Sequence, residues 1–131
     1  MAETSATAAI SEETARRFAI AAGETQGVAS LIVCGRDGEV LAGSGPVDVR
    51  KEAALASFIV QRAEALAQDG DLRGMGRSLA HGRLEEITLS GPAGDSVLLS
   101  FPHCFALVSM RPGVSGPAAV ASLRNIARRY F

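Results

Sequence analysis

Three short apolar segments follow one another in the second half of the chain and predict consecutive β-strands. They occupy residues 84–90, 96–101 and 104–110. Turn-forming residues, mainly glycine and proline, separate them. In the first segment, Ile87 and Leu89 alternate with polar residues, which is typical of a strand with one solvated face. The third segment is apolar from Cys104 to Val108, which is typical of a central strand that is covered on both faces.

The first half of the chain predicts a helix followed by a β-hairpin. Ser11 precedes two glutamates and is a good helix cap, and Gly23 ends the helix. A continuous apolar run at residues 28–35 predicts a second central strand. The Asp-Gly pair at 37–38 is a strong hairpin signal and leads into a short return strand at 40–42.

Residues 49–68 predict the longest helix of the chain, and its apolar arc is unusually wide. The arc covers roughly 220° of the circumference, whereas one packing face needs only about 100°. A helix of this kind is contacted on two sides, once by its own sheet and once by a second subunit or a partner. The positions expected to make the second contact are Ala53, Ala56, Ser57, Val60 and Glu64.

The order of these elements predicts a single α+β domain. We expect residues 1–9 to be a disordered tail, residues 10–131 to form the domain, and the glycine-rich connector at 69–83 to be flexible. The last helix begins at Pro117, at the position that proline favours. With the strands numbered in chain order, a single-layer antiparallel sheet of order 2-1-5-4-3 follows. The long helix should cover one face of this five-stranded sheet and the terminal helices the other.

The alternating strand at 84–90 is expected at the edge of the sheet. An edge strand carries unpaired backbone groups that must be shielded or paired. Here it should lie beside the helix that has surplus apolar surface. The two features together predict a symmetric dimer whose sheet continues across the two-fold axis, with Ile87 and Leu89 at the interface.

Composition and charge exclude several classes of function. The chain is 47% hydrophobic and 21% charged, with a formal net charge of −1, so no overall charge draws it to nucleic acid or to an anionic membrane. Cys34 and Cys104 fall in predicted buried strands and are expected to be core thiols. The polar start of the chain and the lack of a long apolar run predict a soluble cytoplasmic protein with no membrane insertion.

No pattern in the sequence predicts catalysis, a cofactor or a metal site. His81 and His103 lack companion ligands at metal-binding spacing, and Glu85 and Glu86 should point to opposite faces of a strand. No phosphate-binding loop and no nucleophile elbow is present. The basic residues of the connector lack interleaved aromatics, which argues against nucleic-acid binding. We therefore expect a protein that is not an enzyme.

The chain resembles the Roadblock/dynein light chain family, in particular its bacterial, GTPase-associated members. The resemblance covers most of the chain and rests on residues 27–33, 36–42, 52–66, 82–89 and 105–108. It implies a homodimer or a dimer with a paralogous subunit, a platform role without enzymatic activity, and pairing with a small Ras-like GTPase as activator or co-regulator. An activator can supply an arginine finger, for which Arg77 and Arg83 are the candidates, although solvated arginines are the simpler interpretation.

Two other functions stay open at this point. The domain could be a scaffold subunit of a sensor-kinase or another signalling complex that contains no GTPase. Helices on a five-stranded sheet also describe PAS-like and profilin-like sensors of small molecules, which need a cavity lined by mixed polar groups. The core positions of this chain are mostly apolar, which favours an interaction domain.

Overall fold

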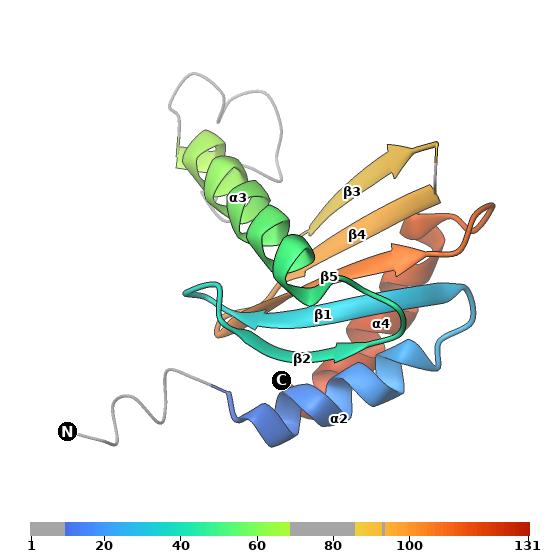
Figure 1. Ribbon diagram of the computed structural model, residues 1–131, viewed down its shortest axis with the longest axis horizontal. Helices are drawn as coiled ribbons and strands as arrows, with labels where there is room; N and C mark the ends of the chain where they lie inside the picture. Colours follow the sequence, from blue (N-terminus) through green and yellow to red (C-terminus); the bar gives the residue numbers. More distant parts are fainter. Residues whose placement is uncertain (1–9, 69–85, 93) are drawn as a thin grey trace.

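The computed structural model describes residues 10–68, 86–92 and 94–131, apart from the side chains of Glu64 and of residues 66–68. The chain forms one sheet with helices on both faces (Figure 1). The tail predicted at 1–9 and the connector predicted at 69–83 lie outside the described residues. In chain order, the elements are α2 (Glu12–Gly23), β1 (Val28–Gly35), β2 (Val40–Ser44), α3 (Val49–Gln68), β3 (Glu86–Gly91), β4 (Gly94–Ser100), β5 (Cys104–Met110) and α4 (Gly116–Tyr130).

The sheet has five antiparallel strands in the order β2-β1-β5-β4-β3, as the sequence predicts. The two strands with continuous apolar sequences, β1 and β5, pair in the middle, with Leu31 opposite Val108. Strand β2 extends to Ser44 and β4 begins at Gly94, so each is two residues longer than predicted at that end. Serine and glycine have low strand propensity, but pairing with the neighbouring strand holds them in the sheet.

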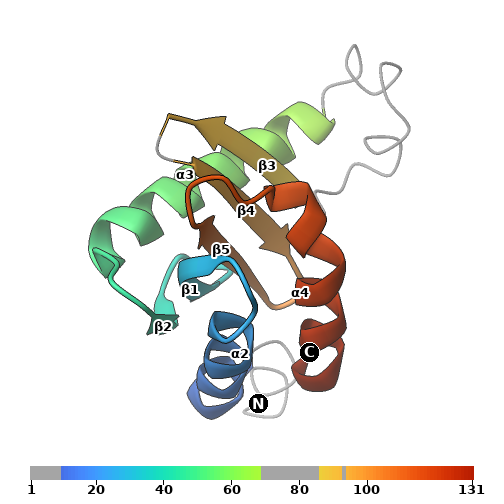
Figure 2. The ribbon, with the colours of Figure 1, turned by 90° about the vertical axis from the view of Figure 1, so that its right-hand side faces the viewer.

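Helices cover the two faces unequally, which confirms the predicted layers. Helix α3 crosses one face, and α2 and α4 lie side by side on the other (Figures 1 and 2). Successive residues of a strand point to opposite faces. Leu31 therefore belongs to the core with Phe18 and Leu123 on the side of α2 and α4, whereas Ile32 joins the core under α3 with Phe105.

Side-chain caps fix where α2 and α4 begin. The Ser11 hydroxyl accepts a hydrogen bond from the Thr14 backbone N–H at 3.0 Å, as its capping pattern predicts. Helix α4 is tied to the sheet, because Asp95 of β4 accepts a hydrogen bond from the Gly116 N–H at 2.8 Å. A Cβ atom at Gly116 would lie 2.9 Å from Val97, so only glycine permits this close approach of α4 to β4.

Both cysteines are buried free thiols, as expected from their place in the central strands. Cys34 faces the core under α3, and Cys104 faces the core under α2 and α4. Burial raises the pKa of the Cys34 thiol to about 11 and that of the Cys104 thiol to about 12. Both thiols are therefore protonated and unreactive in the folded protein near neutral pH.

We expect the protein to lose stability above pH 9, where an unfolded cysteine, with its ordinary pKa of 9.0, begins to ionise. The folded state retains thiol protons that the unfolded chain releases, so the stabilisation is complete below pH 9 and is lost as the pH rises toward 11 or 12. Each thiol should lower the free energy of unfolding by up to about 1.4 kcal/mol per pH unit.

Urea unfolding between pH 7 and pH 11 measures this loss. The double variant Cys34→Ala/Cys104→Ala is the control, since it lacks the two thiols but keeps every other group that titrates in this range. Its stability should fall less steeply with pH than that of the parent protein. Equal slopes, or rapid labelling of the native thiols at pH 8, would contradict the expectation.

Candidate protein-interaction surface

The outer face of α3 presents large apolar side chains to solvent. Leu55 is 45% exposed and Phe58 is 55% exposed. The two residues are three positions apart and are therefore neighbours on the helix surface. The Arg62 guanidinium, one turn further along, lies 5.1 Å from the centre of the Phe58 ring. An apolar pair of this size bordered by a charged group is typical of a protein-binding surface.

The face of α3 that packs on the sheet is built from small residues. Ala53, Ala56 and Val60 are 6%, 0% and 5% exposed and belong to the core that includes Phe105. Small side chains allow the helix axis to approach the sheet closely, so the larger residues of the wide apolar arc are directed outward. The three apolar residues expected at a partner interface are thus covered by the sheet of their own subunit.

The remaining α3 residues expected at the interface have different positions. Ser57 is half-buried, and its hydroxyl lies 2.8 Å from where a Cβ atom on Gly38 would stand, so it packs against the β1–β2 hairpin. The side chain of Glu64 lies outside the described part of the chain. Leu55 and Phe58 are therefore the exposed large apolar residues of the described part of α3.

Strand β3 forms one edge of the sheet, as predicted, with β4 on its inner side. Ile87 is half-buried and packs against the core under α3, and Leu89, two residues on and on the same face, is 39% exposed. Within β3 the charged residue is Glu86, which pairs with Arg124 of α4 at 3.0 Å. From Ile87 to Gly91 the strand contains no charge and no proline, which are common devices against strand pairing.

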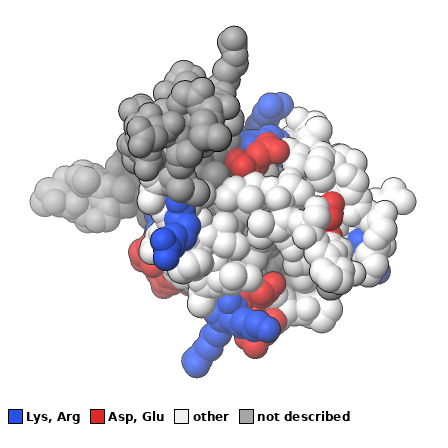
Figure 3. Space-filling view, turned by 90° about the horizontal axis from the view of Figure 1, so that it is seen from above, with Lys and Arg blue, Asp and Glu red and all other residues white. Residues whose placement is uncertain are grey.

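The surface around this edge is poor in charge. Figure 3, which views the molecule from above relative to Figure 1, shows a broad uncharged region between separate groups of charged side chains. The exposed Leu89 and the α3 pair of Leu55 and Phe58 lie on the same side of the sheet. An open strand edge and an exposed apolar helix face therefore occur together, on the side of the molecule where the sequence predicts an interface.

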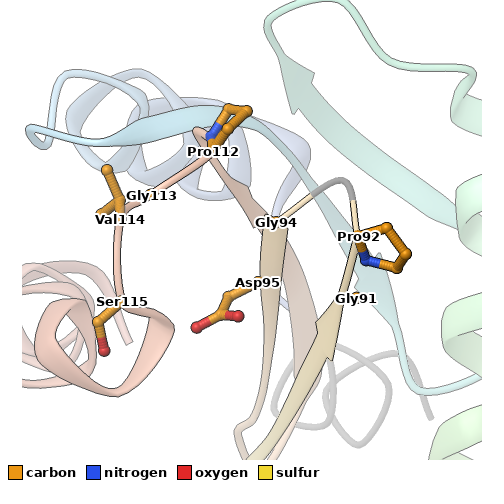
Figure 4. A pocket seen from close by; sticks show the side chains of 8 residues that line it. All are labelled: Gly91, Pro92, Gly94, Asp95, Pro112, Gly113, Val114 and Ser115. Atoms are coloured by element: carbon orange, nitrogen blue, oxygen red, sulfur yellow. The ribbon is translucent and has the colours of Figure 1, made fainter.

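A hollow at the turn between β3 and β4 offers little for chemistry. It has a volume of about 320 Å³ and is closed on its other side by the loop that leads into α4 (Figure 4). Its carboxylate, Asp95, accepts a hydrogen bond from the Gly116 N–H, and its hydroxyl, Ser115, accepts one from the Ala118 N–H. These polar groups hold the start of α4 rather than remaining available for a substrate.

The remaining candidate catalytic and metal-binding residues either lie apart from one another or fall outside the described residues. His103 is exposed in the turn between β4 and β5. His81, Glu85 and the arginine-finger candidates Arg77 and Arg83 lie outside the described residues. Within the described ranges, no group of three or more His, Cys, Asp or Glu side chains is placed to hold a metal ion. No helix of the described ranges is long and apolar enough to cross a membrane.

Comparison with solved structures identifies proteins that share this fold. The gliding protein MglB from Thermus thermophilus matches with a TM-score of 0.66 at 16% identity, over 91% of this chain and 84% of that one. A Roadblock/LC7 domain from Streptomyces avermitilis matches with a TM-score of 0.60 at 16% identity, over 86% and 94%. A structure described as MglB with tetrameric arrangement matches with a TM-score of 0.63 at 18% identity, over 92% of both chains. The sequence matches no family model, and a search of curated proteins found no match.

Proposed function

We propose that this chain, which has the Roadblock/LC7 fold, is a non-enzymatic, cytoplasmic regulatory domain that dimerises and binds a small Ras-like GTPase. The observation that carries the proposal is the exposed apolar pair of Leu55 and Phe58 on α3, on the same side of the sheet as the open edge of β3. The GTPase partner is what the resemblance of the sequence to the bacterial, GTPase-associated members implies.

The proposed dimer joins two β3 strands across a two-fold axis perpendicular to the sheet. Such an axis pairs the strands antiparallel and keeps the corresponding faces of both subunits on one side. Two copies of α3 would then lie on the same face of a continuous sheet. Leu55, Phe58 and Leu89 would be covered at the new contact. The tetrameric arrangement of one MglB structure supports self-association as part of the proposal.

The proposed role of this surface is to bind and regulate rather than to perform chemistry. The exposed residues Leu55, Phe58 and Leu89 present apolar area suited to a protein partner. A partner bound across both α3 helices would contact each subunit, so the dimer would be the binding unit. Such a regulator acts by stabilising one conformation of the GTPase more than another.

Two measurements test the proposal. Light scattering at micromolar concentration should give the mass of a dimer. Hydrolysis of GTP by a bacterial small Ras-like GTPase should then be timed with and without the protein, and complex formation followed by gel filtration; a GTPase encoded beside this gene, where there is one, is the first to test. A monomer would overturn the dimer. A dimer that neither binds the GTPase nor alters its rate would favour the alternative role of scaffold subunit in another signalling complex.

A further inference from the structure

A second hollow, with a mainly apolar lining, lies at the C-terminal end of α4. Helix α4 covers the face of the sheet opposite to α3 (Figure 2). The hollow has a volume of about 220 Å³. The residues that line it are Phe101, Pro102, Arg124, Ala127, Arg128 and Phe131. Arg124, Ala127 and Arg128 belong to α4, and Phe131 follows it. The other two lining residues lie in the turn after β4, so the hollow forms where the end of α4 meets this turn.

Aromatic rings form the wall of this hollow. The rings of Phe101 and Phe131 are 5.1 Å apart, and the fully buried Phe18 lies behind them, 4.8 Å from Phe131. Phe131 remains 36% exposed. Aromatic rings prefer partners at centroid distances of about 4.5–7 Å. The exposed side of this cluster therefore suits one further aromatic or large apolar group.

Backbone hydrogen bonds fix the main chain at both Phe101 and Phe131. The Phe101 N–H donates to the Cys104 carbonyl at 2.8 Å, which closes the tight turn between β4 and β5. The Phe131 N–H donates to the Ala127 carbonyl at 2.7 Å and continues the helical pattern. The two rings also pack on each other and on Phe18, so the wall is ordered within the subunit, which lowers the entropic cost of binding.

Two guanidinium groups stand at the rim of the hollow. Arg124 and Arg128 are four residues apart and share one face of α4. Glu86 of β3 accepts from Nε and Nη2 of Arg124, at 3.3 and 3.0 Å, and so orients this side chain. Arg128 donates through Nη1 to Asn125 at 3.0 Å, and a guanidinium has further N–H donors. Helix α4 carries three arginines and no acidic residue, so the rim favours carboxylates.

The size of the hollow indicates what it holds. Sites for drug-sized molecules measure about 300–1,000 Å³, and this hollow is smaller. It is large enough for a single aromatic side chain. An apolar floor with a cationic rim suits a large apolar side chain that has carboxylates next to it.

We propose that this hollow, the α4 anchor site, docks a short acidic segment of a partner protein through one aromatic side chain. The aromatic anchor packs on Phe101 and Phe131, and a flanking carboxylate meets Arg128, whose guanidinium has N–H donors beyond the one bonded to Asn125. Because α4 and α3 lie on opposite faces of the sheet, the anchor site and the α3 surface can be occupied together. The domain would then link its α3 partner to a second protein.

Three labelled peptides test the anchor site by fluorescence anisotropy. The probe has one phenylalanine with three glutamates on each side. One control peptide replaces the phenylalanine with alanine, and the other replaces the glutamates with glutamines. We expect each control to bind at least about tenfold more weakly than the probe, and added salt to weaken the probe. Equal binding of all three peptides, or no binding of the probe at about 1 mM, would overturn the proposal.

Protein variants locate the binding on the fold. Arg128→Glu and Phe131→Ala should each weaken the probe at least about tenfold, and Arg128→Lys, which keeps the charge but loses the planar fork, should fall between. Arg50→Glu reverses a charge on the exposed start of α3, on the other face, and should change nothing. Thermal unfolding of each variant checks that the fold is retained. Unchanged binding in both Arg128→Glu and Phe131→Ala would overturn the proposal.

Two further experiments distinguish the proposed protein segment from a membrane surface, and the anchor site from the α3 surface. Phosphatidylserine vesicles test a membrane surface as the occupant, since arginines also bind lipid phosphates. Vesicle binding that Arg128→Glu abolishes, without binding of the peptide probe, would overturn the protein-segment proposal. The variant Phe58→Glu alters the α3 surface only and should bind the peptide probe normally. Peptide binding at the anchor site can therefore be found even if the proposed dimer and GTPase binding are not.

Discussion

Phe58→Glu is expected to convert the proposed dimer into a folded monomer. Phe58 is 55% exposed, so the free subunit loses little when the ring is removed. Arg62, whose guanidinium lies 5.1 Å from that ring, can pair with the new carboxylate at the surface. In the dimer the carboxylate would instead be placed in an apolar contact. Loss of a central aromatic anchor costs about 2 kcal/mol or more, so the dimer dissociation constant should rise at least about thirtyfold.

Sedimentation equilibrium over a range of concentrations measures this change. Ile20→Glu is the matched control, because Ile20 is also a large apolar residue, 51% exposed, but lies on α2 on the other face of the sheet. It should leave the mass unchanged. Circular dichroism should show the same helix content for both variants and the parent. A dimer that persists in Phe58→Glu would place the subunit contact elsewhere.

Val60→Glu is expected to unfold the protein rather than to separate its subunits. Val60 lies two residues from Phe58, but it is 5% exposed and packs into the core with Ile32 and Phe105. An unpaired buried carboxylate costs about 3–5 kcal/mol, a large part of the total of about 5–15 kcal/mol that stabilises a typical domain. Most molecules should therefore be unfolded or weakly folded near neutral pH.

The pH dependence of this variant identifies the cause. Burial raises the pKa of a carboxyl group above its unfolded value of about 4.3, so the penalty applies fully once the buried group ionises and shrinks as the pH falls toward 4. Val60→Ala, which removes volume but adds no charge, should cost only about 2 kcal/mol and show no such dependence. Urea unfolding of the three proteins at several pH values tests this. Normal stability of Val60→Glu near neutral pH, combined with a monomeric mass, would show that Val60 lies at an interface.

These two variants distinguish the roles of the two faces of α3. One face is a structural contact of small residues with the sheet, and the other presents Leu55 and Phe58. The same chemical change, a glutamate for an apolar residue, should affect folding at one position and association at the other. The α3 surface is therefore open to mutational study without loss of the fold.

The sequence alone was sufficient for the architecture. Two continuous apolar strands had to lie in the middle of the sheet, and the alternating segment that contains Ile87 had to lie at its edge. The Asp-Gly pair at 37–38 placed the hairpin between β1 and β2. These features follow from local pattern, because a residue's strand period and turn chemistry depend on its immediate neighbours. The resemblance to the Roadblock family is confirmed at the level of the fold.

The orientation of α3 was decided only by tertiary packing. The pattern of apolar residues shows how wide the apolar arc of α3 is, but it does not show which part of this arc packs on the sheet. Close packing selected the small residues Ala53 and Ala56 for the inside and directed Leu55 and Phe58 outward. Hydrophobic periodicity depends on the polarity of the side chains and not on their volume. It therefore does not predict which part of the helix has the shape that fits the sheet.

The sequence pattern does not predict the α4 anchor site either. Its aromatic cluster combines Phe18 of α2, Phe101 after β4 and Phe131 after α4, which are far apart in the chain. Each of these residues alone is an ordinary hydrophobic position. The sequence by itself determined which segments become strands and helices and how the strands are ordered. The tertiary structure decided which side chains remain exposed, because that depends on how surfaces distant in sequence fit together.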